Sequence, residues 1–142
     1  AGVVVCSFLL HGFACFLCPH VFARFQSYVA LPTPKRRACD NSAVSYLHAV
    51  VASFLVLRCY ASTTDPWKDM AFGRLLHADV CFAYMFGYFI YDTFGMWYFN
   101  LFASAKDLLV HHICAILCFA FVLGSSMIEP CVFIIATCEL NS

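Results

Sequence analysis

The sequence predicts an all-α protein, a polytopic bundle of membrane-spanning helices. Hydrophobic residues make up 63% of the 142 residues and charged residues only 11%, whereas soluble domains carry about 45–50% and about 25%. Aromatic residues reach 18%, which is typical of lipid-facing surfaces and interfacial aromatic belts. The apolar residues fall into runs of about 20, long enough to cross a hydrocarbon core of about 30 Å.

Five apolar runs are expected as spans. The first covers residues 3–22, and His11 and His20 within it are expected to hydrogen-bond a neighbouring helix. Two prolines then interrupt helix formation, so residues 32–41 are predicted as a loop. The second run, residues 43–60, has Asn41 or Ser42 as its expected N-terminal cap.

The third and fourth runs, residues 79–99 and 107–123, form a predicted hairpin, and a fifth begins after Pro130. Gly87 and Gly95 in the third run are expected to let another helix approach closely. The chain opens without Met and ends inside the fifth run, so we expect a fragment. Its predicted parts are residues 1–42, the first span with a basic loop, and residues 43–142, a transmembrane domain truncated at the C-terminus.

Basic residues predict the orientation. Lys35, Arg36 and Arg37 follow the first run, and cytosolic loops are enriched in Lys and Arg. With this loop in the cytosol, Arg24 and Lys106 share its side, giving five cations there against three on the other side. We therefore predict that the loop at residues 32–41 faces the cytosol.

The apolar runs contain ionisable groups, which are expensive in hydrocarbon and are functional candidates by default. Asp92 and the His111–His112 pair lie about equally far from the middle of their connection, which predicts contact between them at one depth. His48 enters the same slab from the second run, and Glu139 from the fifth. The residues expected in this polar layer are His48, Asp92, His111, His112, Glu139 and Asn141.

Two interpretations of this layer remain open. The first is simple helix association, since measured interhelical hydrogen bonds in membranes average about 0.6 kcal/mol. The second is a lipid-binding or catalytic site, in which Asp92 orients His111 or His112 as a general base. A metal site is not predicted, because no pair of histidines has the spacing of one helical face. No cofactor is predicted either.

Composition also limits the other classes. The net charge is zero and no basic run is long, which argues against a nucleic-acid partner. Most of the ten cysteines lie inside apolar runs, where they are expected to act as small hydrophobic side chains. Cys15 and Cys18 have redox-motif spacing but lack the required context. The oligomeric state cannot be predicted from the sequence.

The chain resembles the TLC-domain family, which includes the ceramide synthases and the translocating-chain-associated membrane protein, and it is most similar to the smaller TLC-domain-containing proteins. The resemblance covers about residues 45–142 and implies a domain of six or seven helices that handles lipids. The segments that carry it are Ser45-Tyr-Leu-His48-Ala, Gly87-Tyr-Phe-Ile-Tyr-Asp92, His111-His112 and Glu139-Leu-Asn141-Ser.

This resemblance implies a multi-pass membrane protein of lipid homeostasis, acting in membrane lipid composition, lipid sensing or transfer. Membrane lipids are the expected partners, and the endoplasmic reticulum or the plasma membrane the expected location. The alternative is an acyltransferase of ceramide-synthase type that uses the His pair. The downstream His-Asp pair of the synthases is absent from residues 124–142, so a non-enzymatic role is favoured.

Overall fold

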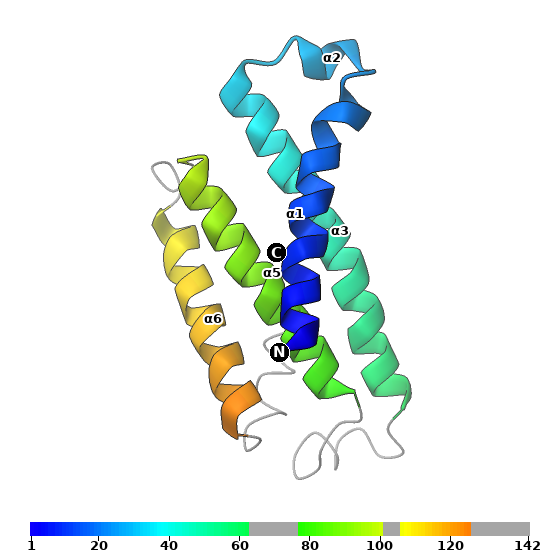
Figure 1. Ribbon diagram of the computed structural model, residues 1–142, viewed down its shortest axis with the longest axis vertical. Helices are drawn as coiled ribbons and strands as arrows, with labels where there is room; N and C mark the ends of the chain where they lie inside the picture. Colours follow the sequence, from blue (N-terminus) through cyan, green and yellow to red (C-terminus); the bar gives the residue numbers. More distant parts are fainter. Residues whose placement is uncertain (63–76, 101–105, 126–142) are drawn as a thin grey trace.

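The computed structural model describes residues 1–62, 77–100 and 106–125, and the described residues form helices and no strand. The long helices alternate in direction along the chain, so that sequence neighbours pack antiparallel (Figure 1). This confirms the all-α bundle. The helices are α1 (Gly2–Phe22), α2 (Gln26–Val29), α3 (Thr33–Ala61), α5 (Ala78–Tyr98) and α6 (Lys106–Ser125).

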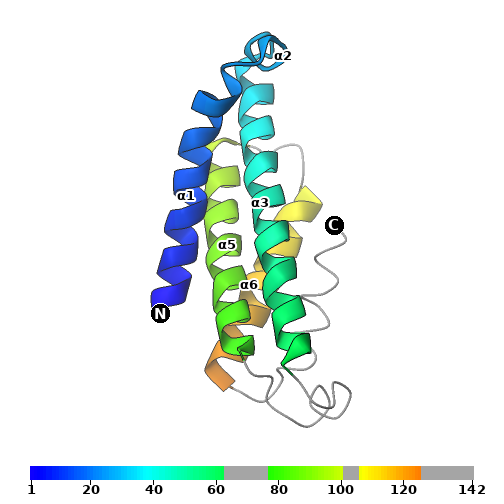
Figure 2. The same ribbon diagram turned by 90° about the vertical axis from the view of Figure 1, so that its right-hand side faces the viewer.

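Helix α5 is the centre of the bundle. It packs against α1, α3 and α6, and Figure 2 shows it between α1 and the other two. Thirteen of its 21 residues are buried, a far larger share than in any lipid-facing helix. Its predicted range, residues 79–99, is confirmed within one residue at each end. Because α5 presents most of its surface to other helices, it buries four tyrosine or acidic side chains, which are Tyr84, Tyr88, Tyr91 and Asp92.

Three of the described helices, α1, α3 and α6, are long and apolar enough to cross a membrane. Large apolar side chains lie exposed on their outer faces, where a bilayer would cover them. The central α5 is not among the three, and the predicted fifth run falls outside the described residues. Examples of the exposed side chains are Phe13 and Phe16 on α1, Val50 and Phe54 on α3, and Val110 and Leu117 on α6.

Helix α1 crosses α5 at Gly87. A Cβ atom placed on Gly87 would lie 2.5 Å from the Val4 carbonyl oxygen and 2.7 Å from Ser7 Cβ. The Ser7 hydroxyl donates a hydrogen bond of 2.7 Å to the Tyr84 carbonyl, which ties the two backbones together at this point. The prediction of close approach is therefore confirmed at Gly87. At Gly95 the nearest atom to an added Cβ is Asn41 Oδ1 at 3.8 Å, an ordinary contact.

The predicted loop at residues 32–41 is wrong. Helix α3 begins at Thr33, with Pro32 as its N-cap and Pro34 in its first turn. Proline is tolerated in the first turn of a helix, because the N–H that it lacks has no intrahelical partner there and its φ suits the helix. Asn41 and Ser42 are consequently interior helical residues and not caps. The basic triplet occupies the first turns of α3, and the side of the membrane it faces remains a prediction.

Candidate functional site

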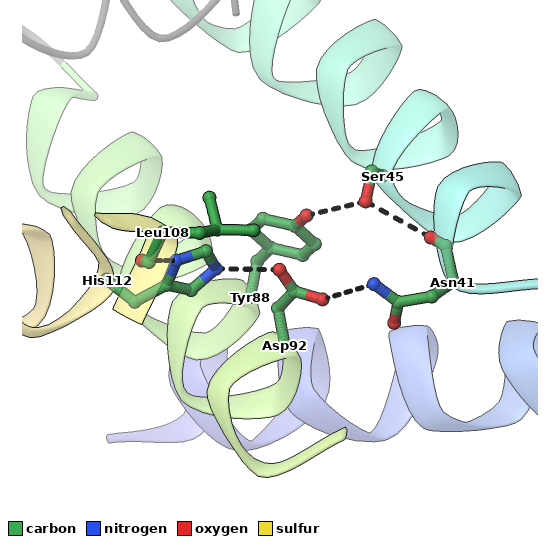
Figure 3. Close-up of polar contacts among 6 residues, drawn as sticks. All are labelled: Asn41, Ser45, Tyr88, Asp92, Leu108 and His112. Atoms are coloured by element: carbon green, nitrogen blue, oxygen red, sulfur yellow. Dashed lines mark hydrogen bonds and ion pairs between the residues drawn. The ribbon is translucent and has the colours of Figure 1, made fainter. Parts of the chain in front are cut away.

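The predicted contact across the hairpin is confirmed. His112 on α6 places its Nε2 atom 2.7 Å from Asp92 Oδ2 on α5. Both side chains are buried, at 3% and 4% exposure respectively. Figure 3 shows this pair at the centre of a chain of polar contacts.

The second ring nitrogen of His112 fixes the protonation pattern of the pair. His112 Nδ1 lies 2.7 Å from the carbonyl oxygen of Leu108, one turn earlier on the same helix. A carbonyl oxygen only accepts hydrogen bonds, so Nδ1 carries a proton. A second proton then lies between Nε2 and the carboxyl group, on one atom or the other. In either position the Asp92–His112 pair has a net charge of zero.

Helix α3 supplies the third side of this arrangement. The Asn41 side-chain amide donates to Asp92 Oδ1 at 2.9 Å. One turn further, the Ser45 hydroxyl donates to the Asn41 carbonyl at 3.1 Å and accepts from the Tyr88 hydroxyl at 3.0 Å. Asp92 is therefore held by two other helices, one through each carboxyl oxygen (Figure 3).

These groups line a pocket of about 400 Å³ between α3, α5 and α6. His48, Asp92, His111 and His112 all contribute to its wall, so four residues of the predicted polar layer meet there. Glu139 and Asn141, the other two, fall outside the described residues. The other lining residues are Asn41, Ser42, Ser45, Ala49, Ala52, Met85, Tyr88, Phe89, Met96 and Leu108.

His48 lies flat against Tyr88, with ring centroids 3.6 Å apart and an interplanar angle of 9°. Behind it, His11 is fully buried, and its Nε2 atom forms a hydrogen bond of 3.1 Å with the Tyr84 hydroxyl on α5. The expectation that His11 bonds a neighbouring helix is confirmed. For His20 it is wrong, because this exposed ring bonds the Phe16 carbonyl of its own helix.

Sequence reasoning missed Asn41, Ser45 and Tyr88 as site residues. A spacing signal was available for all three. Asn41, Ser45 and His48 recur at intervals of four and three, which places them on one face of a helix. Tyr88 precedes Asp92 by one turn, so both face the same neighbours. The loop predicted around Asn41 concealed the first of these patterns.

The described residues also bear on two other kinds of site, a metal centre and a redox disulfide. Among them no three His, Cys, Asp or Glu side chains gather in a group suited to a metal ion. The described cysteines are all free thiols, and Cys15 and Cys18 form no disulfide. Cys131 and Cys138 fall outside the described part of the chain.

Comparison with known proteins gives one match. A family model described as the TLC domain matches residues 38–142, close to the extent of the resemblance seen in the sequence. No curated protein and no solved structure matches the chain. The matched stretch begins inside α3, three residues before Asn41, and includes every residue that lines the pocket.

Proposed function

Because the chain belongs to the TLC-domain family, we propose that it is a multi-pass protein of lipid homeostasis that binds a membrane lipid between α3, α5 and α6. The family match and the three apolar helices make it an integral membrane protein. Its proposed location is the endoplasmic reticulum or the plasma membrane. The proposed role covers lipid composition, sensing or transfer.

The observation that carries this proposal is the pocket itself. Its volume of about 400 Å³ falls within the range of about 300–1,000 Å³ that small-molecule sites occupy. It combines apolar walls with a few convergent polar groups, which is the composition of such sites. Placing Asp92 and His112 inside an apolar bundle is costly, and residues of this kind usually mark a ligand pathway or a site.

Acyl transfer is the second candidate, and His111 is the observation that favours it. Both ring nitrogens of His112 are engaged, by Asp92 and by the Leu108 carbonyl, so His112 has no nitrogen left to accept a proton from a substrate. His111 lines the same pocket and is only half-buried. In an acyltransferase His111 would be the general base, and Asp92 with His112 would shape the site around it.

The proposed function is tested with Asp92→Asn in cells that lack the endogenous protein. The substituted amide donates to His112 Nε2 and accepts from Asn41, so it preserves both hydrogen bonds and removes only the ionisable proton. We expect wild-type protein to change the cellular lipid profile and Asp92→Asn to leave it like that of the empty cells. Asp79→Asn is the matched control, because Asp79 is exposed at the start of the same helix, and it should act like wild type.

The comparison is made at equal amounts of inserted protein. A full wild-type lipid profile with Asp92→Asn would remove this carboxyl group from the function. Loss of the variant from the membrane would assign Asp92 to helix packing instead. If membranes with wild-type protein transfer acyl groups to an added acceptor faster than membranes of empty cells, and His111→Ala abolishes the difference, the acyltransferase is favoured.

A further inference from the structure

His48 differs from three other helical histidines of this chain. His11, His20 and His112 each place Nδ1 within hydrogen-bond distance of the carbonyl four residues earlier, at 2.7, 3.1 and 2.7 Å. This local bond fixes the ring and occupies the nitrogen. The ring of His48 lies instead against Tyr88, and its Nδ1 has no hydrogen-bond partner although it is buried.

An unpaired buried nitrogen is costly. His48 is only 8% exposed, and a buried polar atom without a partner loses the free energy of the hydrogen bonds that it made to water. The side chain lines the pocket, and since Nδ1 is buried, the ring must turn about its Cβ–Cγ bond before a ligand bound there can supply the missing partner. Asn41 Oδ1, two turns away on the same face of α3, is also buried and without a partner. Both residues line the pocket from α3.

The charge of the wall restricts the ligand. Among the described lining residues there is no Lys or Arg, and the one acidic residue, Asp92, is neutralised by His112. His48 and His111 are imidazoles and carry no permanent charge. A phosphate group brought against these described residues would lose its hydration without gaining from them the cation that phosphate sites provide. A hydroxyl group has no such penalty, and it pairs with either tautomer of His48 because it both donates and accepts.

We propose that the pocket takes an uncharged lipid whose head-group hydroxyl hydrogen-bonds His48, and that it discriminates against lipids whose head group is a phosphate. This inference rests on the lipid-binding function proposed above and adds the chemical class of the lipid. The volume of about 400 Å³ is near the lower end of the range for small-molecule sites, so the pocket holds a head group and the beginning of a chain. The shared chemistry is the hydroxyl, which a diacylglycerol and a sterol both offer.

The test is photolabelling of the full chain in membranes with three probes. Each carries a diazirine and an alkyne: a diacylglycerol, the phosphatidic acid with the same acyl chains, and a cholesterol analogue. The first two differ only in hydroxyl against phosphate, so they isolate the charge argument. Labelled peptides are mapped, and only labelling on α3, α5 or α6 beside the pocket is counted. We expect the diacylglycerol or the cholesterol probe to label there, and the phosphatidic acid to label at least about fivefold less.

His48→Phe tests the role of the nitrogen, because the phenyl ring keeps the stack on Tyr88 and cannot hydrogen-bond. The expected loss of hydroxyl-lipid labelling is about fivefold, the factor that one hydrogen bond of about 1 kcal/mol provides. His20→Phe is the matched control on an exposed histidine outside the pocket, and it should label like wild type. His48→Gln restores a hydrogen-bonding group and should recover part of the labelling.

The possible outcomes distinguish a failure of this inference from a failure of the proposed lipid-binding function. Pocket labelling by phosphatidic acid as strong as that by the better hydroxyl-lipid probe, or full labelling of His48→Phe, would overturn the inference and leave a lipid pocket in place. An absence of pocket labelling with every lipid probe would overturn the proposed function itself. Labelling by cholesterol but not by diacylglycerol would support the class and identify a sterol as its source. If His48→Phe does not accumulate, the comparison of phosphatidic acid with the hydroxyl lipid that labels the wild-type protein decides.

Discussion

Substituting Gly87 by alanine should separate helix α1 from α5. The new Cβ atom would lie 2.5 Å from the Val4 carbonyl oxygen and 2.7 Å from Ser7 Cβ. Both neighbours belong to the backbone of α1 or lie directly on it, so no flexible side chain can yield. To reach an ordinary contact of about 3.4 Å, α1 must move away by about 0.9 Å at this crossing.

The displacement has a calculable effect on the neighbouring hydrogen bonds. The Ser7 hydroxyl, now 2.7 Å from the Tyr84 carbonyl, would move to about 3.6 Å, which is too far for a hydrogen bond. Overpacking a close helix contact costs about 1–3 kcal/mol, and the lost interhelical bond adds about 0.6 kcal/mol. The higher helix propensity of alanine offsets at most about 1 kcal/mol of this loss in stability. The net expectation is a destabilisation of about 2 kcal/mol.

Gly95→Ala is the matched control. It lies two turns along the same helix, where an added Cβ meets only Asn41 Oδ1 at 3.8 Å, so alanine gains helix propensity without a clash. In a thermal unfolding assay of the purified protein in detergent, Gly87→Ala should unfold below wild type and Gly95→Ala at or above it. Equal midpoints for the two variants would refute the close crossing of α1 and α5 at Gly87.

Two other predictions concern the polar contacts and the orientation. Asp92→Ala leaves the Asn41 amide and His112 Nε2 without their shared partner and should destabilise the bundle by about 2–4 kcal/mol. Asp92→Asn should cost less than about 1 kcal/mol in the same unfolding assay. Equal losses of stability in the two variants would show that these hydrogen bonds do not hold α3 and α6 to α5. In protein that reaches the plasma membrane, a membrane-impermeant maleimide should label Cys39 only after the membrane is opened, because the basic triplet beside it is expected in the cytosol. Cys39→Ala is the blank, and labelling of Cys39 on intact cells would reverse the predicted orientation.

Apolar runs predicted most of the fold, because the thickness of a bilayer fixes the length of each span. The boundaries of α1, α5 and α6 followed from that count. Depth along a helix also predicted that Asp92 meets the His pair. Depth along a helix does not predict how the helix is rotated about its axis. Adjacent residues point about 100° apart, and the sequence does not specify which face of the partner helix they meet. Both histidines line the pocket, and only the packed structure identifies His112 as the one that bonds Asp92.

The wrong start of α3 and the missed role of Asn41 have one cause. Prolines at residues 32 and 34 fit both the end of one helix and the first turn of the next, and nothing nearby in the sequence decides between the two. The consequence for the site is large. With a helix beginning at Thr33, Asn41 lies in the third turn and faces α5, where its amide reaches Asp92. With a loop in that place, the carboxyl group would have lacked a partner from α3.

The length of α3 also sets the depth of the pocket. Its 29 residues extend about 43 Å, which exceeds a hydrocarbon core of about 30 Å by about 13 Å. If the basic first turns occupy the head-group region, that excess ends close to Asn41, eight residues into the helix. Asn41 and Asp92 then lie at the edge of the hydrocarbon, and His48 lies about 10 Å deeper along α3. A lipid entering from the bilayer would therefore meet the polar end of the pocket at the depth of its own head group, and its hydroxyl would then move about 10 Å deeper to reach His48.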